Sequence, residues 1–164
     1  MKKITFLTMI VIVSASFAQD NSLTQVSYTN PEKFTDFETQ LGANDRLDRL
    51  KKDLNRNINK LWKKTITNGD SLTINFTDID MAGRIIFGIE QIREVRVDTD
   101  RSVLEFDYTI KNKNGKVIKS GHEKLVNNNL ARLDRNQLRY DNSRLKYEVA
   151  EMAKWMRELS KELG

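Results

Sequence analysis

The feature that most constrains the fold of this chain is a change in the spacing of its apolar residues. Between residues 44 and 65 they recur every three or four positions, which predicts an amphipathic helix. That apolar stripe consists of Leu47, Leu50, Leu54, Ile58, Leu61 and Trp62. From Leu72 to Phe76 apolar and polar residues alternate instead, which predicts a half-buried strand. The two periods in one chain of 164 residues indicate a single domain that mixes helix and sheet.

Four other segments show the alternation or the composition expected of strands. They are residues 23–28, 95–97, 103–110 and 117–125. Residues 112–115 predict a tight hairpin, since Asn-Gly accepts the positive φ angles of such turns. Gly121 indicates a β-bulge in the returning strand. After an Asn- and Arg-rich loop at 126–142, a second amphipathic helix is predicted over residues 143–162.

These elements predict an α+β fold. The expected architecture is a two-layer sandwich, with two long amphipathic helices on one face of an antiparallel or mixed sheet of about four or five strands. Trp155 flanks the apolar stripe of the last helix, so we expect it in the core between that helix and the sheet. After Pro31 we expect a turn or short helix that packs Phe34 and Phe37 over the core.

Residues 1–18 have the pattern of a cleaved secretory signal. Lys2 and Lys3 are followed by a mostly apolar run that is too short to span a bilayer. Ser16 and Ala18 are the small residues that signal peptidase requires, so cleavage is predicted after Ala18. The mature chain, residues 19–164, is then a single periplasmic domain, and no transmembrane segment is expected after cleavage.

Composition excludes several classes of site. The absence of cysteine excludes disulfides, thiolate metal sites and cysteine nucleophiles. A single histidine, His122, excludes any mechanism that needs two imidazoles. Residues 1–18 hold two lysines and no acids, so their removal lowers the formal net charge from +5 to +3. This small excess does not indicate nucleic-acid binding.

Asp78 and Asp80 are the carboxylates with the most chemical interest. Spaced i,i+2 at a strand end, they would point the same way and could bind a cation such as Ca²⁺ or act as acid and base. The alternative is structural: the strand stops at Thr77, and one of the two caps the following turn through backbone amides. A continued strand would place Asp78 on the side of Ile74 and Phe76, where a buried carboxylate needs partners.

His122 lies in the returning strand, two residues after Ser120. With neighbouring carboxylates it could hold a weakly bound metal, and the alternative is a structural hydrogen bond on the face of the strand. A nucleophilic serine two residues from its base is not a recurring arrangement, and no G-x-S-x-G elbow is present. We therefore predict no catalytic residue, no metal ligand and no cofactor.

The polar side of the first predicted helix gathers basic residues within about a third of the helical wheel. They are Arg49, Lys52, Arg56, Lys60 and Lys63, and the acidic residues Asp45, Asp48 and Asp53 interrupt them. Such a face can meet anionic lipid headgroups, polyanionic glycans or an acidic protein. The alternative is a face that is only solvated.

Several short segments resemble one family in the same order along the chain. They are residues 30–36 (NPEKFTD), 77–83 (TDIDMAG), 114–117 (NGKV) with Ser120-Gly121, 145–148 (LKYE) and Trp155. They cover nearly all of the mature chain and resemble the secreted proteobacterial family called domain of unknown function 3016. The resemblance implies one periplasmic-type domain behind a signal peptide, with no known activity. One departure is the Asp-Thr-Asp-Arg turn at 98–101, where a proline-rich turn is expected.

The sequence therefore predicts a periplasmic, non-catalytic binding or interaction module of the cell envelope. Its expected partner is an envelope protein or an anionic envelope polymer, and not a nucleic acid. The alternative is a small metal-binding protein or hydrolase centred on Asp78 and Asp80.

Overall fold

The structure is a computed structural model that describes residues 23–36, 44–66, 68–86, 92–130 and 145–163. Its elements are β1 (Thr24–Tyr28), the 3-10 helix η1 (Pro31–Lys33), α1 (Asn44–Thr65), β2 (Ser71–Asp80), β3 (Arg84–Ile86), β4 (Ile92–Glu94), β5 (Ser102–Lys111), β6 (Val117–Asn127) and α3 (Lys146–Leu163). The α+β class predicted from the two apolar periods is confirmed.

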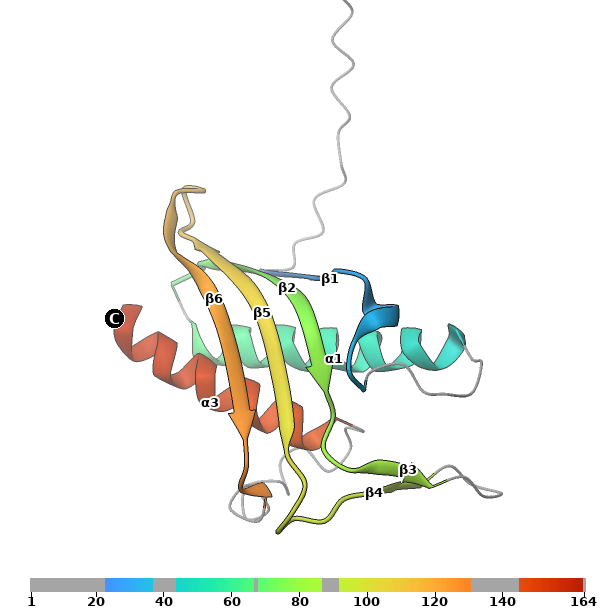
Figure 1. Cartoon of the computed structure of the whole chain (residues 1–164). Helices are drawn as coiled ribbons and strands as arrows, with labels where there is room; N and C mark the ends of the chain where they lie inside the picture. The colour runs from blue at the N-terminus through green and yellow to red at the C-terminus, as the bar shows by residue number, and fades with distance from the viewer. Residues whose placement is uncertain (1–22, 37–43, 67, 87–91, 131–144, 164) are drawn as a thin grey trace, which may run out of the picture.

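Four strands form one open mixed sheet in the order β1-β2-β5-β6 (Figure 1). β1 and β2 are parallel, and α1 connects them, as parallel neighbours require a crossover. β2, β5 and β6 pair antiparallel in sequence order. β3 and β4 form a separate two-stranded hairpin. In Figure 1 this hairpin extends away from the ends of the long strands.

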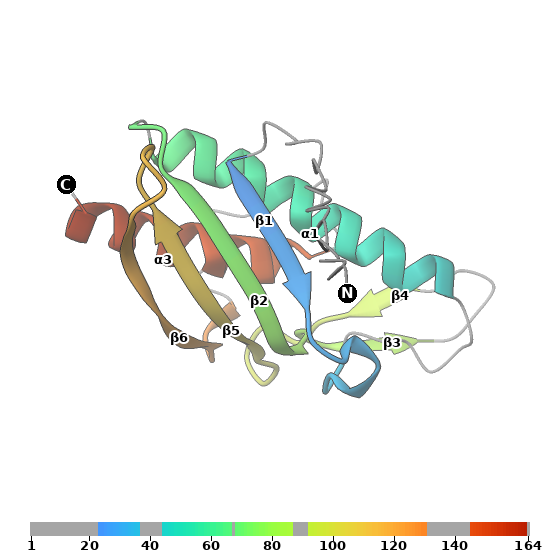
Figure 2. The same ribbon diagram turned by 90° about the horizontal axis from the view of Figure 1, so that it is seen from above.

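The main core joins both helices to the sheet. Alternate residues of β2 and β5 form one buried cluster with the apolar stripes of α1 and α3. α1 contacts β1, α3 contacts β5 and β6, and the two helices contact each other (Figure 2). Trp62 is fully buried, and its indole N–H donates to the carbonyl oxygen of Asp70 at 2.8 Å. Trp155 is 6% exposed and packs edge-to-face on Phe106 and Tyr108, which confirms its expected place.

A β-bulge in β2 explains one wrong prediction. The strand does not stop at Thr77 but continues to Asp80, with a shift in pairing between Phe76 and Asp78. Before the shift Phe76 pairs with Phe106, and after it Asp78 pairs with Glu105. The extra residue exchanges the two faces of the strand, so that Asp78 does not share the buried side of Phe76.

Other boundaries also differ from the sequence expectations. Val95 and Val97 lie beyond the end of β4 and belong to no strand. Gly121 pairs regularly with Tyr108, and the irregularity of this ladder lies instead between Ile110 and Lys111. β6 runs two residues further than predicted, and α3 begins at Lys146.

The segments that follow β1 and β5 form the turns that their local sequences predict. The 3-10 helix after Pro31 and the burial of Phe34 are as expected, whereas Phe37 and residues 131–142 of the predicted loop lie outside the described residues. In the predicted hairpin, Asn112 Oδ1 accepts hydrogen bonds from the backbone N–H groups of Asn114 and Lys116, both at 3.0 Å.

Candidate functional site

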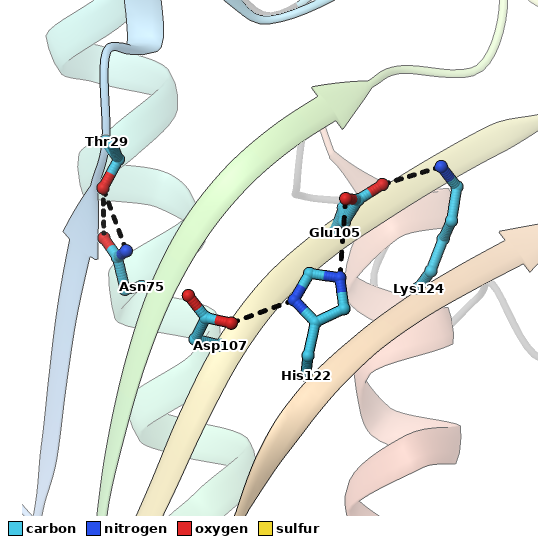
Figure 3. Close-up of polar contacts among 6 residues, drawn as sticks. All are labelled: Thr29, Asn75, Glu105, Asp107, His122 and Lys124. Carbon is cyan, nitrogen blue, oxygen red and sulfur yellow. Dashed lines mark hydrogen bonds and ion pairs between the residues drawn. The ribbon is translucent and has the colours of Figure 1, made fainter.

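A polar row crosses the sheet on the side that alternates with the core residues. Ser27 pairs with Asn75, Asn75 with Asp107, and Asp107 with His122, so the row includes all four strands. Ser27 Oγ donates to Asn75 Oδ1 at 3.0 Å. Asn75 Nδ2 donates to Thr29 Oγ1 at 2.9 Å, as Figure 3 shows. The amide of Asn75 therefore binds β1 to β2 on this face.

His122 lies between two carboxylates of β5 (Figure 3). Its Nδ1 is 2.9 Å from Asp107 Oδ1, and its Nε2 is 3.4 Å from Glu105 Oε1. The hydrogen bond to Asp107, with the negative charges of both carboxylates, raises the pKa of His122 above its usual 6.5. The side chain is 52% exposed, so solvent screens these pairs. A hydrogen bond on the face of the strand is one of the two alternatives that the sequence left open for His122.

Glu105 also binds the neighbouring cation of β6. Its Oε2 accepts a hydrogen bond from Lys124 Nζ at 2.7 Å, while its Oε1 faces His122. Both oxygens of Glu105 are thus engaged with basic groups. Within the described ranges, no three His, Asp or Glu side chains are grouped so that they could hold a metal ion.

Asp78 is bound to the segment that follows η1. Its Oδ1 accepts the backbone N–H of Thr35 at 2.7 Å, and its Oδ2 accepts the Thr35 hydroxyl at 2.8 Å. The carboxylate does receive a backbone amide, but from a segment 43 residues earlier instead of from the turn after β2. Its contacts join β2 to the end of η1.

Asp80 is half-buried at the end of β2, where its backbone forms an isolated parallel β-bridge with Asp36. Burial raises the pKa of the Asp80 carboxyl, Arg101 lowers it, and the negative charges of Asp78 and Glu148 raise it. Glu148 is fully buried in the first turn of α3, where its Oε1 accepts the backbone N–H of Ala82 at 2.9 Å.

The five basic residues predicted on the first helix are all exposed. We call Arg49, Lys52, Arg56, Lys60 and Lys63 the basic face of α1. They alternate with the buried stripe of the helix, which includes Leu54 and Ile58, and Arg56 forms an ion pair with Asp53. The structure therefore leaves these side chains in contact with solvent, as the wheel predicted.

A groove between α1 and α3 was not predicted from the sequence. We call it the helix groove, and it is lined by Asn57, Lys60, Leu61, Lys64, Thr65, Ala153 and Arg157. Its volume is about 510 Å³. Only Lys60 belongs to both the groove and the basic face. The i,i+4 spacing of Lys60 with Lys64, and of Ala153 with Arg157, was a visible signal, but nothing local indicated that the two helices adjoin there.

Comparison with known proteins identifies a family. The profile of the family described as "Protein of unknown function (DUF3016)" matches residues 22–158, as the motifs indicated. No curated protein is detectably similar in sequence. A 2.35 Å crystal structure of a minor lipoprotein from Acinetobacter baumannii aligns with 87% of this chain and 95% of its own, at 10% identity. Its TM-score of 0.29 is too low to support an argument about fold. Because the profile spans most of the sequence, this chain belongs to the DUF3016 family.

Proposed function

We propose that this protein is a non-catalytic binding module of the cell envelope, and that the basic face of α1 holds an anionic envelope polymer. In this proposal residues 1–18 are a signal peptide that is cleaved after Ala18. Residues 19–164 are then one periplasmic domain. The observation that carries the proposal is the exposure of all five cations of the basic face along one helix.

The arrangement of layers supports this assignment. We infer that α1 and α3 lie together on one face of the sheet, because both contribute to a single core with alternate residues of β2 and β5. The other face holds the polar row, in which His122, Asp107 and Glu105 are engaged with one another. The outer side of α1 then remains as a charged surface that faces solvent. Asp48 and Asp53, the partner of Arg56, reduce the net charge of this surface, but the excess of cations still attracts a polyanion over about a Debye length, roughly 8–10 Å.

The contacts of the acidic residues support a structural role for them. Both oxygens of Asp78 are bound by Thr35, and both nitrogens of His122 face carboxylates. A general base requires an acceptor that can reach a substrate proton, and a hard cation requires several oxygens around one point. No described contact of Asp78 or Asp80 favours the hydrolase or metal-binding alternative. Among the described residues, no helix combines the length and apolar composition needed to cross a membrane.

A polyanion column tests the proposed surface. Purified 19–164 should be retained on immobilised dextran sulfate at low salt. It should elute as the salt concentration rises, because salt screens the attraction between the basic face of α1 and the sulfate groups. We expect Lys52→Glu with Arg56→Glu to elute at clearly lower salt than wild type. The matched control is Lys113→Glu with Lys116→Glu, which makes the same change in net charge on the β5–β6 hairpin.

The control variant decides whether the basic face of α1 or only the total charge of the protein causes retention on dextran sulfate. An equal shift for both pairs of substitutions would show that net charge alone causes retention, and the proposal would be wrong. Failure of wild type to bind at low salt would have the same consequence. Export has its own test: mass spectrometry of periplasmic extract should find Gln19 at the N-terminus, and a mature protein that keeps Met1 would refute the location.

A further inference from the structure

The helix groove has the properties of a binding site for a small molecule. It lies between α1 and α3, and three of the seven described residues that line it are cationic: Lys60, Lys64 and Arg157. We propose that the helix groove binds a single-chain amphiphile with a phosphate monoester head group. The three cations hold the phosphate, and Leu61 and Ala153 contact the apolar chain.

Acidic partners neutralise some cations of the described residues, but not those of the groove. Lys119 binds Glu162, Lys124 binds Glu105, and Lys154 lies 3.5 Å from Glu151. By contrast, none of Lys60, Lys64 and Arg157 forms a salt bridge within the described part of the chain. The lining described for the groove also contains no acidic side chain. An anionic ligand would therefore meet positive charge that no described carboxylate neutralises.

Favourable interaction with a helix dipole does not explain the positions of all three groove cations. Lys64 lies in the last turn of α1, where a cation interacts favourably with the helix dipole. Arg157 lies on the other helix, and the basic residue in the last turn of α3 is Lys161. The arginine that faces Lys60 and Lys64 across the groove therefore has no such role.

The remaining lining fits an apolar chain. Leu61 is partly buried against the main core, and Ala153 is 3% exposed, so together they form an apolar base between the charged side chains. Asn57 and Thr65 add polar groups that can donate or accept hydrogen bonds. A volume of about 510 Å³ lies within the range of small-molecule sites, roughly 300–1,000 Å³.

The head group follows from the kind and number of the cations. A guanidinium donates in a fixed fork that matches two phosphate oxygens, and ammonium groups bind phosphate as point charges. A phosphate monoester carries a charge of about −1.5 to −2 at neutral pH and presents three acceptor oxygens. It can therefore engage all three cations, whereas a carboxylate with one charge and two oxygens cannot satisfy them equally.

Calorimetric titration of 19–164 with decyl phosphate, kept below the concentration at which it forms micelles, tests the site. We expect inorganic phosphate and the uncharged detergent decyl maltoside each to bind at least tenfold more weakly than decyl phosphate. Lys64→Glu with Arg157→Glu should weaken binding of decyl phosphate at least tenfold. Both positions are exposed, and a thermal melt of the variant confirms that it is folded.

Lys52→Glu with Arg56→Glu is the matched control, because it changes net charge equally but leaves the groove lining intact. It should bind decyl phosphate within about twofold of wild type. Equal weakening in the control, or equal binding of inorganic phosphate or decyl maltoside, would overturn the proposal. The polymer-binding proposal is tested separately, since that same control variant is the one expected to lose dextran sulfate.

Discussion

Replacing Trp155 by alanine tests the packing of α3 on the sheet. The centroid of the indole ring lies 5.0 Å from the ring centroid of Phe106 and 5.2 Å from that of Tyr108, at interplanar angles of 80° and 76°. Truncation of a buried aromatic residue costs about 3–5 kcal/mol, which includes the two edge-to-face contacts at about 0.5–1.5 kcal/mol each. A domain of this size has about 5–15 kcal/mol of stability in total. The melting temperature should therefore fall by roughly 6–20 °C.

Urea unfolding measures this loss with two independent probes. Trp62 remains as the only tryptophan of the Trp155→Ala variant, and its burial makes its fluorescence a probe of α1. Circular dichroism reports on both helices, and coincident transitions would justify a two-state analysis. Glu158→Ala, an exposed substitution on the same helix, should change stability by less than about 0.5 kcal/mol. A loss below about 1 kcal/mol for Trp155→Ala would refute the packing of this side chain.

Three further perturbations test a close approach, an ion pair and a carboxylate. Gly69 and Gly83 have almost equal φ angles of 84° and 83°, but only at Gly83 would an added Cβ collide with the end of β4. Thermal melts should therefore show that Gly83→Ala costs about 1–3 kcal/mol more stability than Gly69→Ala. Equal losses for the two variants would contradict this collision. The NMR titration of His122, the single histidine, should give a pKa above 6.5 that Asp107→Asn lowers. Because folding raises this pKa, the stabilising effect of the pair is present below pH 6.5 and is lost as the pH rises through the folded value; a pH-independent difference between wild type and His122→Asn would refute the pairing. Asp78→Asn keeps an acceptor for the backbone N–H that Asp78 binds, so it should lower the free energy of unfolding by under about 1 kcal/mol. Asp78→Ala removes that acceptor and should lower it by about 1–2 kcal/mol. A melting temperature that Ca²⁺ raises in wild type but not in Asp78→Asn would instead indicate a cation site.

The long elements were predictable because their side-chain periods are local properties. Leu54, Ile58 and Trp62 recur at helical spacing, and all three are fully buried. Ile74 and Phe76 alternate with polar residues and are equally buried. A helix or a strand that buries one face shows its own period of apolar residues, and this period does not depend on which element covers that face.

The segment after β4 and the helix groove depend on partners that are distant in sequence. Val95 and Val97 alternate with polar residues, but they pack on a second cluster that includes Tyr147. Their alternation reports burial against a helix and not pairing in a sheet, and no local pattern separates the two. The helix groove likewise combines Lys64 with Arg157, which are more than 90 residues apart in the chain.

The bulge in β2 shows why a pair of carboxylates at i,i+2 is weak evidence for catalysis. Without it, Asp78 would share the buried side of Phe76, and Ile79 would face the polar row. With the shift in pairing, Ile79 is fully buried, and Asp78 lies opposite Glu105 and within reach of Thr35. The cost of the bulge is visible at Thr77, whose Oγ1 is buried without a hydrogen bond in the described part of the chain. Burial of one isoleucine and removal of one carboxylate from the core are sufficient to explain where Asp78 lies.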